Sequence, residues 1–244
     1  MKTAVITGAS GALGKAVAEK FLENDYFTVG QYNTGRDRIE KFGNLLKNIG
    51  KSDYFFPFCA DFSCADGANA LADFTLENFG HADALVLNAG ADLYKLCTDT
   101  EAAEWDRLFD INVKSAFLLV KRLLPSMLER KRGKIVFVSS IWGINGACME
   151  SAYSATKAAL IGFCKSLAKE VSPSGVTVNC VCPGVIDTPM NDRFSAEEKA
   201  ELIAKTPLNR FGTSREIAEL IAFLCEKADF ITGQTITADG GFTL

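Results

Sequence analysis

The chain has 244 residues, 48% of them hydrophobic and 23% charged, which indicates one globular domain rather than a disordered chain. Its net charge of −4 excludes binding of nucleic acid through a strongly basic surface, a mode that depends on many cations displacing counterions. No apolar run reaches the roughly 20 residues of a membrane span, and the N-terminus leads straight into a predicted strand, so we expect a cytoplasmic protein without a signal peptide.

Short apolar runs of strand length alternate along the chain with longer segments of helical periodicity. This alternation predicts an α/β fold, in which residues 1–244 form one doubly wound parallel sheet (a Rossmann fold) with helices on both faces. The predicted strands are Thr3–Thr7, Phe27–Gln31, Tyr54–Cys59, Ala84–Asn88, Lys134–Ser139, Thr177–Val181 and Gln234–Thr237. The predicted helices are Leu13–Asn24, Arg36–Asn48, Cys64–Phe79, Ala102–Arg130, Ser151–Val171, Ala196–Lys205 and Ser214–Cys225. The long polar segment Val185–Arg210 is expected to form a flap over a ligand.

The first predicted strand is followed at once by a glycine-rich turn. Residues 7–14 read T-G-A-S-G-A-L-G and open a helix. Glycines allow a tight turn and a close approach of the backbone, so the N–H groups at the start of the helix can hold a pyrophosphate. The turn therefore predicts a dinucleotide site, although plain strand-to-helix turns also use glycine.

The end of the second strand distinguishes NADH from NADPH, because an acid there binds the ribose hydroxyls and a cation there binds the 2′-phosphate. No acid ends this strand, and Tyr32 occupies the place. Asn33, Thr34 and Arg36 can donate hydrogen bonds to a phosphate, which favours NADPH. Asp37 is a rival ligand for the ribose, so NADH stays open, and Arg36 can also be a solvated charge at a helix start.

The strongest chemical signal is Tyr153 followed by Lys157, because residues four apart share a face of a helix. A free tyrosine titrates near pH 10, too high for acid–base catalysis at neutral pH. An ammonium about 4 Å away at an effective dielectric of 20 favours the phenolate by roughly 4 kcal/mol before screening, which moves the pKa of Tyr153 toward physiological pH. The pair can also be an exposed one on a helix surface. However, the predicted strand Lys134–Ser139 ends in hydroxyls at the carboxyl edge of the sheet, where wound folds bind their ligands.

These segments, in this order, resemble the short-chain dehydrogenase/reductase family over nearly the whole chain. The turn is similar to the family's T-G-x-x-x-G-x-G signature, with Ala12 at the position of the middle glycine. C-A-D-F at 59–62, N-A-G at 88–90 and C-P-G at 182–184 are similar to the family's other cofactor segments. The cofactor contacts that the resemblance implies, beside Tyr153 and Lys157, are Gly8, Ser10, Gly11, Ala12, Leu13, Gly14, Asn33, Thr34, Arg36, Asp61, Phe62, Asn88, Ala89, Gly90, Pro183, Gly184, Val185, Ile186 and Thr188.

The resemblance also implies a catalytic group of Asn112, Ser140, Tyr153 and Lys157 in a carbonyl oxidoreductase. Ser140 is chosen over Ser139 by the family's interval to Tyr153, and Asn112 lies in a long helix whose local irregularity holds a water next to the lysine. In these roles Ser140 donates to the substrate carbonyl and Tyr153 protonates the alkoxide. Lys157 lowers the pKa of Tyr153 and holds the nicotinamide ribose, and Asn112 relays protons. As alternatives, Asn112 can face solvent from the middle of a helix, and Asn88 can serve only to tie its own turn.

The C-terminal segments P-L-N-R-F-G at 207–212 and I-T-G-Q-T-I-T-A-D-G-G at 231–241 look most like 3-oxoacyl-[acyl-carrier-protein] reductases of fatty acid biosynthesis. This likeness implies NADPH-dependent reduction of a 3-oxoacyl thioester and a homotetramer. Acyl carrier protein is acidic, so docking predicts a basic patch near the cleft. The basic residues of such a patch are Arg130, Lys131, Arg132 and Lys134. Lys131 matches one docking position of those reductases, whereas Ser174 stands at a second docking position where they have arginine.

Other interpretations remain open at this point. The basic residues can be a solvated loop. The same fold also serves NAD(P)-dependent dehydrogenases of sugars, polyols and steroid alcohols. A regulator that senses the nucleotide without turnover is a third reading, which the intact catalytic group disfavours.

The cysteines and the histidine predict no metal site. Eight cysteines occur without a C-x-x-C pair, and His81 is the only histidine that could complete a ligand set. Because most of the cysteines have apolar neighbours, we expect small, reduced core residues. His81 precedes the fourth predicted strand and is expected at the surface.

Overall fold

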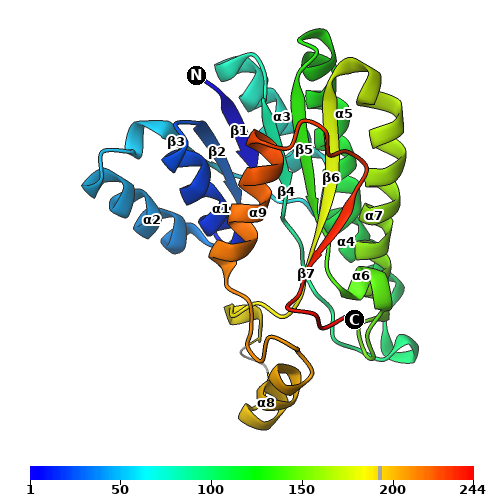
Figure 1. Cartoon of the computed structure of the whole chain (residues 1–244). Coiled ribbons are helices and arrows are strands. Elements are labelled where there is room, and N and C mark those ends of the chain that lie inside the picture. Colours follow the sequence, from blue (N-terminus) through cyan, green and yellow to red (C-terminus); the bar gives the residue numbers. More distant parts are fainter. Residues whose placement is uncertain (192–193) are drawn as a thin grey trace.

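The computed structural model describes residues 1–191 and 194–244 and confirms the α/β sheet (Figure 1). In this part of the chain, seven parallel strands follow the order β3-β2-β1-β4-β5-β6-β7. The strands are β1 (Thr3–Ile6), β2 (Phe27–Tyr32), β3 (Phe55–Cys59), β4 (Ala84–Leu87), β5 (Gly133–Val138), β6 (Val176–Pro183) and β7 (Thr235–Ala238). The α-helices are α1 (Ala12–Glu23), α2 (Arg36–Asn48), α3 (Ala65–Phe79), α4 (Ala102–Phe109), α5 (Ser115–Glu129), α6 (Trp142–Asn145), α7 (Ser151–Val171), α8 (Ala196–Ala204) and α9 (Ser214–Glu226).

Helices cover both faces of the sheet because its central strands are apolar on both sides. All residues of β1 and β4 are buried, as expected for parallel strands. One core cluster joins the sheet to α3, α5 and α7, and a second joins the other face to α1, α2 and α9. Leu71, Leu119 and Leu160 belong to the first cluster, and Phe21, Phe42 and Ile221 to the second.

The strand order reverses at β1, which pairs with β2 on one side and with β4 on the other. The connections therefore diverge at the carboxyl ends of these two strands, and wound sheets bind ligands in the crevice that this divergence leaves. The carboxyl ends of all the strands point toward the lower edge of Figure 1, where α8 extends below the sheet. A ligand site is therefore expected at this edge.

Most predicted boundaries agree with the structure within one or two residues, with one informative difference. The predicted helix Ala102–Arg130 is interrupted by one π-helical turn at Asp110–Lys114, between α4 and α5. The short helix α6 was not predicted, because four residues carry no helical period. The remaining short elements are η1 (Ser52–Tyr54), η2 (Cys97–Asp99), η4 (Ser172–Ser174) and η5 (Pro189–Asn191).

The expectation that most of the cysteines are core residues is confirmed for four of the eight and wrong for the other four. Cys164, Cys180, Cys182 and Cys225 are buried, whereas Cys59, Cys64, Cys97 and Cys148 are exposed. Cys59 ends β3, which lies at the edge of the sheet, so an apolar neighbourhood in sequence does not cover it. All eight are free thiols. Within the described residues, no group of three or more His, Cys, Asp or Glu side chains could hold a metal ion, and no helix has the length and hydrophobicity needed to span a bilayer.

Candidate active site

The glycine-rich turn is folded as tightly as its sequence predicts. Gly8 has φ +71°, and a Cβ there would lie 2.9 Å from Nδ2 of Asn88. A Cβ on Gly14 would lie 2.2 Å from the carbonyl oxygen of Gly8. Gly11 begins α1 without a capping side chain. The first N–H groups of the helix, including those of Ala12 and Leu13, therefore have no partner within the helix and suit a pyrophosphate.

The loop after β2 lies against this turn. Gly35 is buried, and a Cβ there would lie 2.5 Å from Oγ of Ser10. Asn33, Thr34 and Arg36 are exposed around this contact. The hydrogen-bond donors of these three side chains are thus exposed to solvent near Ser10, where a phosphate group on the adenosine ribose of a dinucleotide could reach them. Asp37, the rival ligand, is also exposed at the start of α2.

Asp61 and Phe62 follow β3 at the same edge of the sheet. The N–H of Ser63 donates to Asp61 Oδ1 at 2.9 Å, and this bond holds the pKa of the carboxyl below its ordinary value. Phe62 is 4% exposed and belongs to the core. Asp61 itself is exposed, so its polar groups face the solvent beside the cleft.

Asn88 and Ala89 join the carboxyl ends of β4 and β1. The N–H groups of Asn88 and Ala89 donate to Oγ1 of Thr7 at 2.9 and 2.8 Å, and Nδ2 of Asn88 donates to the carbonyl of Thr7 at 2.9 Å. Asn88 thus ties two strands together and is not limited to its own turn. Gly90 is exposed, and a Cβ there would lie 3.4 Å from Nζ of Lys157. This segment therefore connects the glycine-rich turn to Lys157 of the expected catalytic group.

Tyr153 and Lys157 share a face of α7 and are both buried. Nζ of Lys157 lies 5.5 Å from the centroid of the Tyr153 ring and donates to the carbonyl of Val138 at 3.0 Å. Tyr153 is 9% exposed. Burial lowers the pKa of Lys157 to about 8. The pair is therefore not the exposed helix-surface pair that its sequence also allowed.

Asn112 lies inside the π-helical turn and is 1% exposed. Its Oδ1 accepts from the N–H of Ala91 at 2.8 Å, and its Nδ2 donates to the carbonyl of Ala91 at 2.9 Å and to Oγ1 of Thr156 at 2.9 Å. Thr156 in turn donates to the carbonyl of Tyr153 at 2.7 Å. The alternative in which Asn112 faces solvent is therefore wrong. The π turn is the local irregularity that was expected, a feature frequent at functional sites.

The two serines after β5 differ in what their hydroxyls do. Oγ of Ser139 donates to the carbonyl of Lys157 at 2.8 Å, so its proton is committed to α7. Oγ of Ser140 accepts from the N–H of Trp142 at 3.2 Å, which does not use its own proton. Ser140 is thus the better donor to a substrate oxygen, in agreement with the choice made on the family interval.

Trp142 and the C-terminal tail form a wall beside Tyr153 that the sequence did not predict. Trp142 packs against the cluster of Leu108, Ala152 and Tyr153, and its ring meets that of Phe242 edge to face at 5.7 Å. The tail is held by Asp239, whose carboxylate accepts from Gly241 and Thr243. The position of Trp142 two residues after Ser140 was a usable signal. Phe242 lies about a hundred residues further along the chain, and no local pattern connects it to the site.

Comparison with known proteins agrees with this geometry. The family model described as Enoyl-(Acyl carrier protein) reductase matches residues 8–243. The chain is 40% identical to an uncharacterized oxidoreductase, YmfI, of Bacillus subtilis over 99% of this chain and 98% of that one. It is 36% identical to the 3-oxoacyl-[acyl-carrier-protein] reductase FabG of Staphylococcus aureus over 98% and 97%.

The chain belongs to the short-chain dehydrogenase/reductase family. A solved structure titled short-chain dehydrogenase/reductase SDR:Glucose/ribitol dehydrogenase, from Brucella melitensis, is 34% identical, with a TM-score of 0.90 over 100% of this chain and 97% of that one. A sheet of this kind together with these relatives identifies an NAD(P)-dependent oxidoreductase.

The segment Val185–Arg210, which was expected to form a flap, is anchored near both of its ends. A backbone bridge joins Ile186 to Gly212, and Nδ2 of Asn191 donates to the carbonyl of Ile186 at 2.6 Å. At the far end the N–H of Leu208 donates to the carbonyl of Gly240 in the tail at 3.1 Å. Residues 192–193 of the expected flap lie outside the described residues. Near its base, Pro183 ends β6 and accepts from Ile141, which places Gly184, Val185 and Thr188 after the same sheet edge.

The basic patch does not lie where the sequence analysis expected it. Arg130–Lys134 lead into the amino end of β5, on the edge of the sheet opposite Ser140. Arg130 is paired with Asp83 at 2.8 Å and Lys134 with Asp229 at 2.7 Å, so two of the four cations are neutralised. The prediction that these residues form a docking patch near the cleft of the same subunit is therefore wrong, because the connection between α5 and β5 places them at the amino edge of the sheet.

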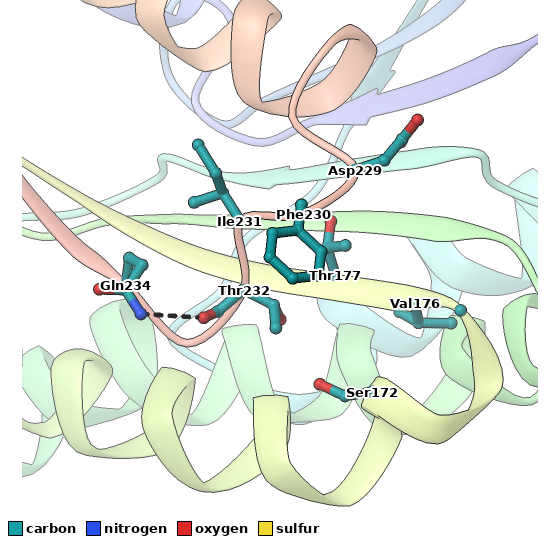
Figure 2. Close-up of a pocket in the computed structure, with 9 residues that line it drawn as sticks. Ser172, Val176, Thr177, Asp229, Phe230, Ile231, Thr232 and Gln234 are labelled. Atoms are coloured by element: carbon teal, nitrogen blue, oxygen red, sulfur yellow. Dashed lines mark hydrogen bonds between the residues drawn. The ribbon is translucent and has the colours of Figure 1, made fainter.

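The same amino edge carries a shallow pocket of about 450 Å³ (Figure 2). Val176 and Thr177 at the start of β6 line it together with Asp229–Thr232. Phe230 is fully exposed there. His81, expected at the surface, lies at this edge half-buried, with Nε2 3.2 Å from Oδ2 of Asp83. These groups lie at the edge of the sheet opposite Ser140, so they are separate from the expected catalytic group.

Proposed function

We propose that this protein is a cytoplasmic, NADPH-dependent carbonyl reductase that transfers a hydride to the ketone of a 3-oxoacyl thioester. The observation that carries the proposal is the convergence of Asn112, Ser140, Tyr153 and Lys157 at the carboxyl edge of the sheet, beside the glycine-rich turn. The names of relatives at 35–36% identity over the full chain support the 3-oxoacyl substrate.

The residues divide the chemistry as follows. The bound cofactor supplies the hydride from its nicotinamide ring. Ser140 donates a hydrogen bond to the substrate carbonyl oxygen, where negative charge develops during the transfer, and keeps its own proton. Tyr153 gives its proton to the resulting alkoxide and leaves as the phenolate, which the ammonium of Lys157 favours. Asn112, bonded to Thr156 beside Tyr153, supports the return of a proton from solvent.

The residues present fit a dinucleotide. The helix-start amides of Ala12–Gly14 would hold the pyrophosphate, Asp61 and Phe62 would border the adenine, and Lys157 would contact the nicotinamide ribose. Pro183–Ile186 and Thr188 would approach the carboxamide from the base of the flap. A Cβ at position 8 would collide with Asn88, and a Cβ at position 14 would collide with the carbonyl of Gly8, so this form of the turn requires glycine at both positions.

NADPH is proposed over NADH because hydrogen-bond donors follow β2, which suit the 2′-phosphate, and no acidic residue ends the strand to bind the ribose hydroxyls. Asn33, Thr34 and Arg36 are displayed around the contact of Gly35 with Ser10. The test is Arg36→Ala, with the exposed Arg132→Ala, at the opposite, amino edge of the sheet, as matched control. Loss of one charge-assisted bond predicts a fall of about tenfold in kcat/KM for NADPH and little change for NADH. A preference for NADH that survives Arg36→Ala would contradict this assignment.

The substrate is tested directly by NADPH and NADH oxidation with a short 3-oxoacyl thioester, with and without acyl carrier protein. We expect turnover with the thioester, and faster turnover when acyl carrier protein carries it. The carrier protein as partner is proposed from the names of the relatives, and the homotetramer from the resemblance of the C-terminal segments. Size-exclusion chromatography with light scattering measures the assembly.

A dehydrogenase of a sugar, polyol or steroid alcohol is the second candidate. The Brucella structure favours it, since its title names glucose/ribitol dehydrogenase at a TM-score of 0.90. A panel of these alcohols with NADP+ and NAD+ separates the two. Turnover of an alcohol on the panel without turnover of the thioester would replace the first proposal by the second.

A further inference from the structure

Gln31 occupies a place in the proposed cofactor site that its sequence did not indicate. It lies in β2, one residue before the end of the strand, and is 3% exposed. Its Oε1 accepts from the N–H of Gly8 at 2.9 Å, and its Nε2 donates to the carbonyl of Ala60 at 2.7 Å. One side chain thus bridges the glycine-rich turn and the residue that precedes Asp61.

We infer that Gln31 is a positioning residue of the dinucleotide site, which fixes the turn for the pyrophosphate relative to the loop for the adenosine. The inference rests on the proposed cofactor contacts of Gly8–Gly14 and Asp61. The hydrogen bonds of the Gln31 side chain join it to Gly8 and Ala60, and not to Tyr153 or Lys157. Its effect on the reaction is therefore an effect on cofactor binding.

The first half of the bridge sets the conformation of the turn. Gly8 has φ +71°, and its N–H points to Gln31 instead of to the ligand. The backbone carbonyl of Gln31 also accepts from the N–H of Ala9 at 2.7 Å. Two successive amides are thus bound to one residue of β2. The amides that remain for a pyrophosphate are those further along, at the start of α1.

The second half of the bridge sets the adenosine loop. Ala60 donates its N–H to the carbonyl of Tyr32 at 2.9 Å and accepts from Gln31 through its own carbonyl. Asp61 follows directly and accepts from Ser63. A displacement of Ala60 therefore displaces Asp61. Only a side chain with both a donor and an acceptor at this length satisfies both partners, and a buried partner left unpaired is costly.

A purely structural role would produce different measurements. A residue that only holds the ends of three strands together would, when replaced, lower the folded fraction and the melting temperature. The molecules that remained folded would bind the cofactor with unchanged affinity. A positioning residue instead changes the Kd of the folded molecules, while kcat at saturating cofactor stays the same. Calorimetry separates these outcomes, because it gives the stoichiometry and the Kd independently.

The experiment compares Gln31→Met with the wild type by calorimetry with NADPH and by steady-state kinetics with the substrate identified above. Methionine has a similar length and neither bond. We expect the Kd for NADPH to rise about tenfold, with kcat within about twofold of the wild type. The matched control is Gln234→Met, an exposed glutamine before β7 whose Nε2 donates to Thr232, and its Kd should not change.

Gln31→Asn covers the case in which the methionine variant fails to fold. Asparagine keeps the polar groups but is one methylene too short to reach both Gly8 and Ala60, so the Kd should rise in the same direction. An unchanged Kd in either folded variant would overturn the inference, as would a reduced stoichiometry with an unchanged Kd. If the wild type binds neither NADPH nor NADH, the proposed function fails instead, so the two failures are distinguishable.

Discussion

Lys157 approaches the ring of Tyr153, with Nζ 5.5 Å from the ring centroid, while it donates to the carbonyl of Val138 at 3.0 Å. The bond to β5 fixes the ammonium at the carboxyl edge of the sheet, and the helical spacing brings the phenol to it. Burial costs the ammonium part of its stability, which is why the pKa of Lys157 falls to about 8. The same group that favours the phenolate is therefore itself close to titration at physiological pH.

This burial predicts a pH dependence of stability. The folded chain releases the Lys157 proton near pH 8, whereas the unfolded chain holds it to its ordinary value of 10.5. Between these values the unfolded state binds more protons, so the contribution of Lys157 to the free energy of unfolding rises with pH, by up to about 3 kcal/mol. The buried thiols of Cys164 and Cys225 act in the opposite direction, because burial raises their pKa to about 12.

Urea unfolding of the wild type and of Lys157→Met separates the lysine from Cys164 and Cys225, because these two thiols have no interaction with Lys157 and contribute equally to both proteins. The difference in unfolding free energy should move in favour of the wild type from pH 8 to pH 10.5. A difference that is constant across this interval would show that the ammonium is not desolvated in the folded state.

The glycine-rich turn predicts an asymmetry between two glycine substitutions in helices. Gly14→Ala places a Cβ 2.2 Å from the carbonyl oxygen of Gly8, and the turn must open to relieve the contact. Overpacking costs about 1–3 kcal/mol. If the turn must lose that much to bind the cofactor, the Kd for NADPH rises about tenfold or more. Gly43→Ala in α2 is the control, because its Cβ would meet nothing within 4 Å. It should leave the Kd unchanged and stabilise the helix by about 0.5–1 kcal/mol. Equal effects of the two variants on the Kd would contradict the assignment of the turn.

Much of the fold could be predicted from sequence, because β1 and β4 read as buried apolar runs and the longer helices keep their period. The pairing of Tyr153 with Lys157 depends on spacing within one helix, so it was also accessible. What the sequence could not provide were contacts that depend on the assembled sheet: the bridge from Gln31 to Gly8 and Ala60, the ring contact of Trp142 with Phe242, and the ion pairs of Arg130 and Lys134. The basic patch was misplaced for this reason, since charge is visible in sequence and the edge that carries it is not.

The two serines after β5 predict a contrast between neighbours. Ser140→Ala removes the proposed donor to the substrate carbonyl, and we expect kcat to fall by about 10²–10³-fold. Ser139→Ala removes the bond to the carbonyl of Lys157, and we expect a loss of about 1–3 kcal/mol in unfolding free energy with most of the turnover kept. Steady-state kinetics and urea unfolding of both variants measure the contrast. The reverse pattern would make Ser139 the donor.

The central claim is that the Tyr153 hydroxyl is the proton donor in a site that does not need this hydroxyl to bind the cofactor. Tyr153→Phe removes one hydroxyl and keeps the ring beside Lys157 and the cluster of Leu108 and Ala152. The decisive measurement is the Kd for NADPH together with the single-turnover rate of hydride transfer in this variant. We expect a Kd close to that of the wild type and a rate lower by at least about 10²–10⁴-fold. A rate equal to that of the wild type would contradict the proposed mechanism.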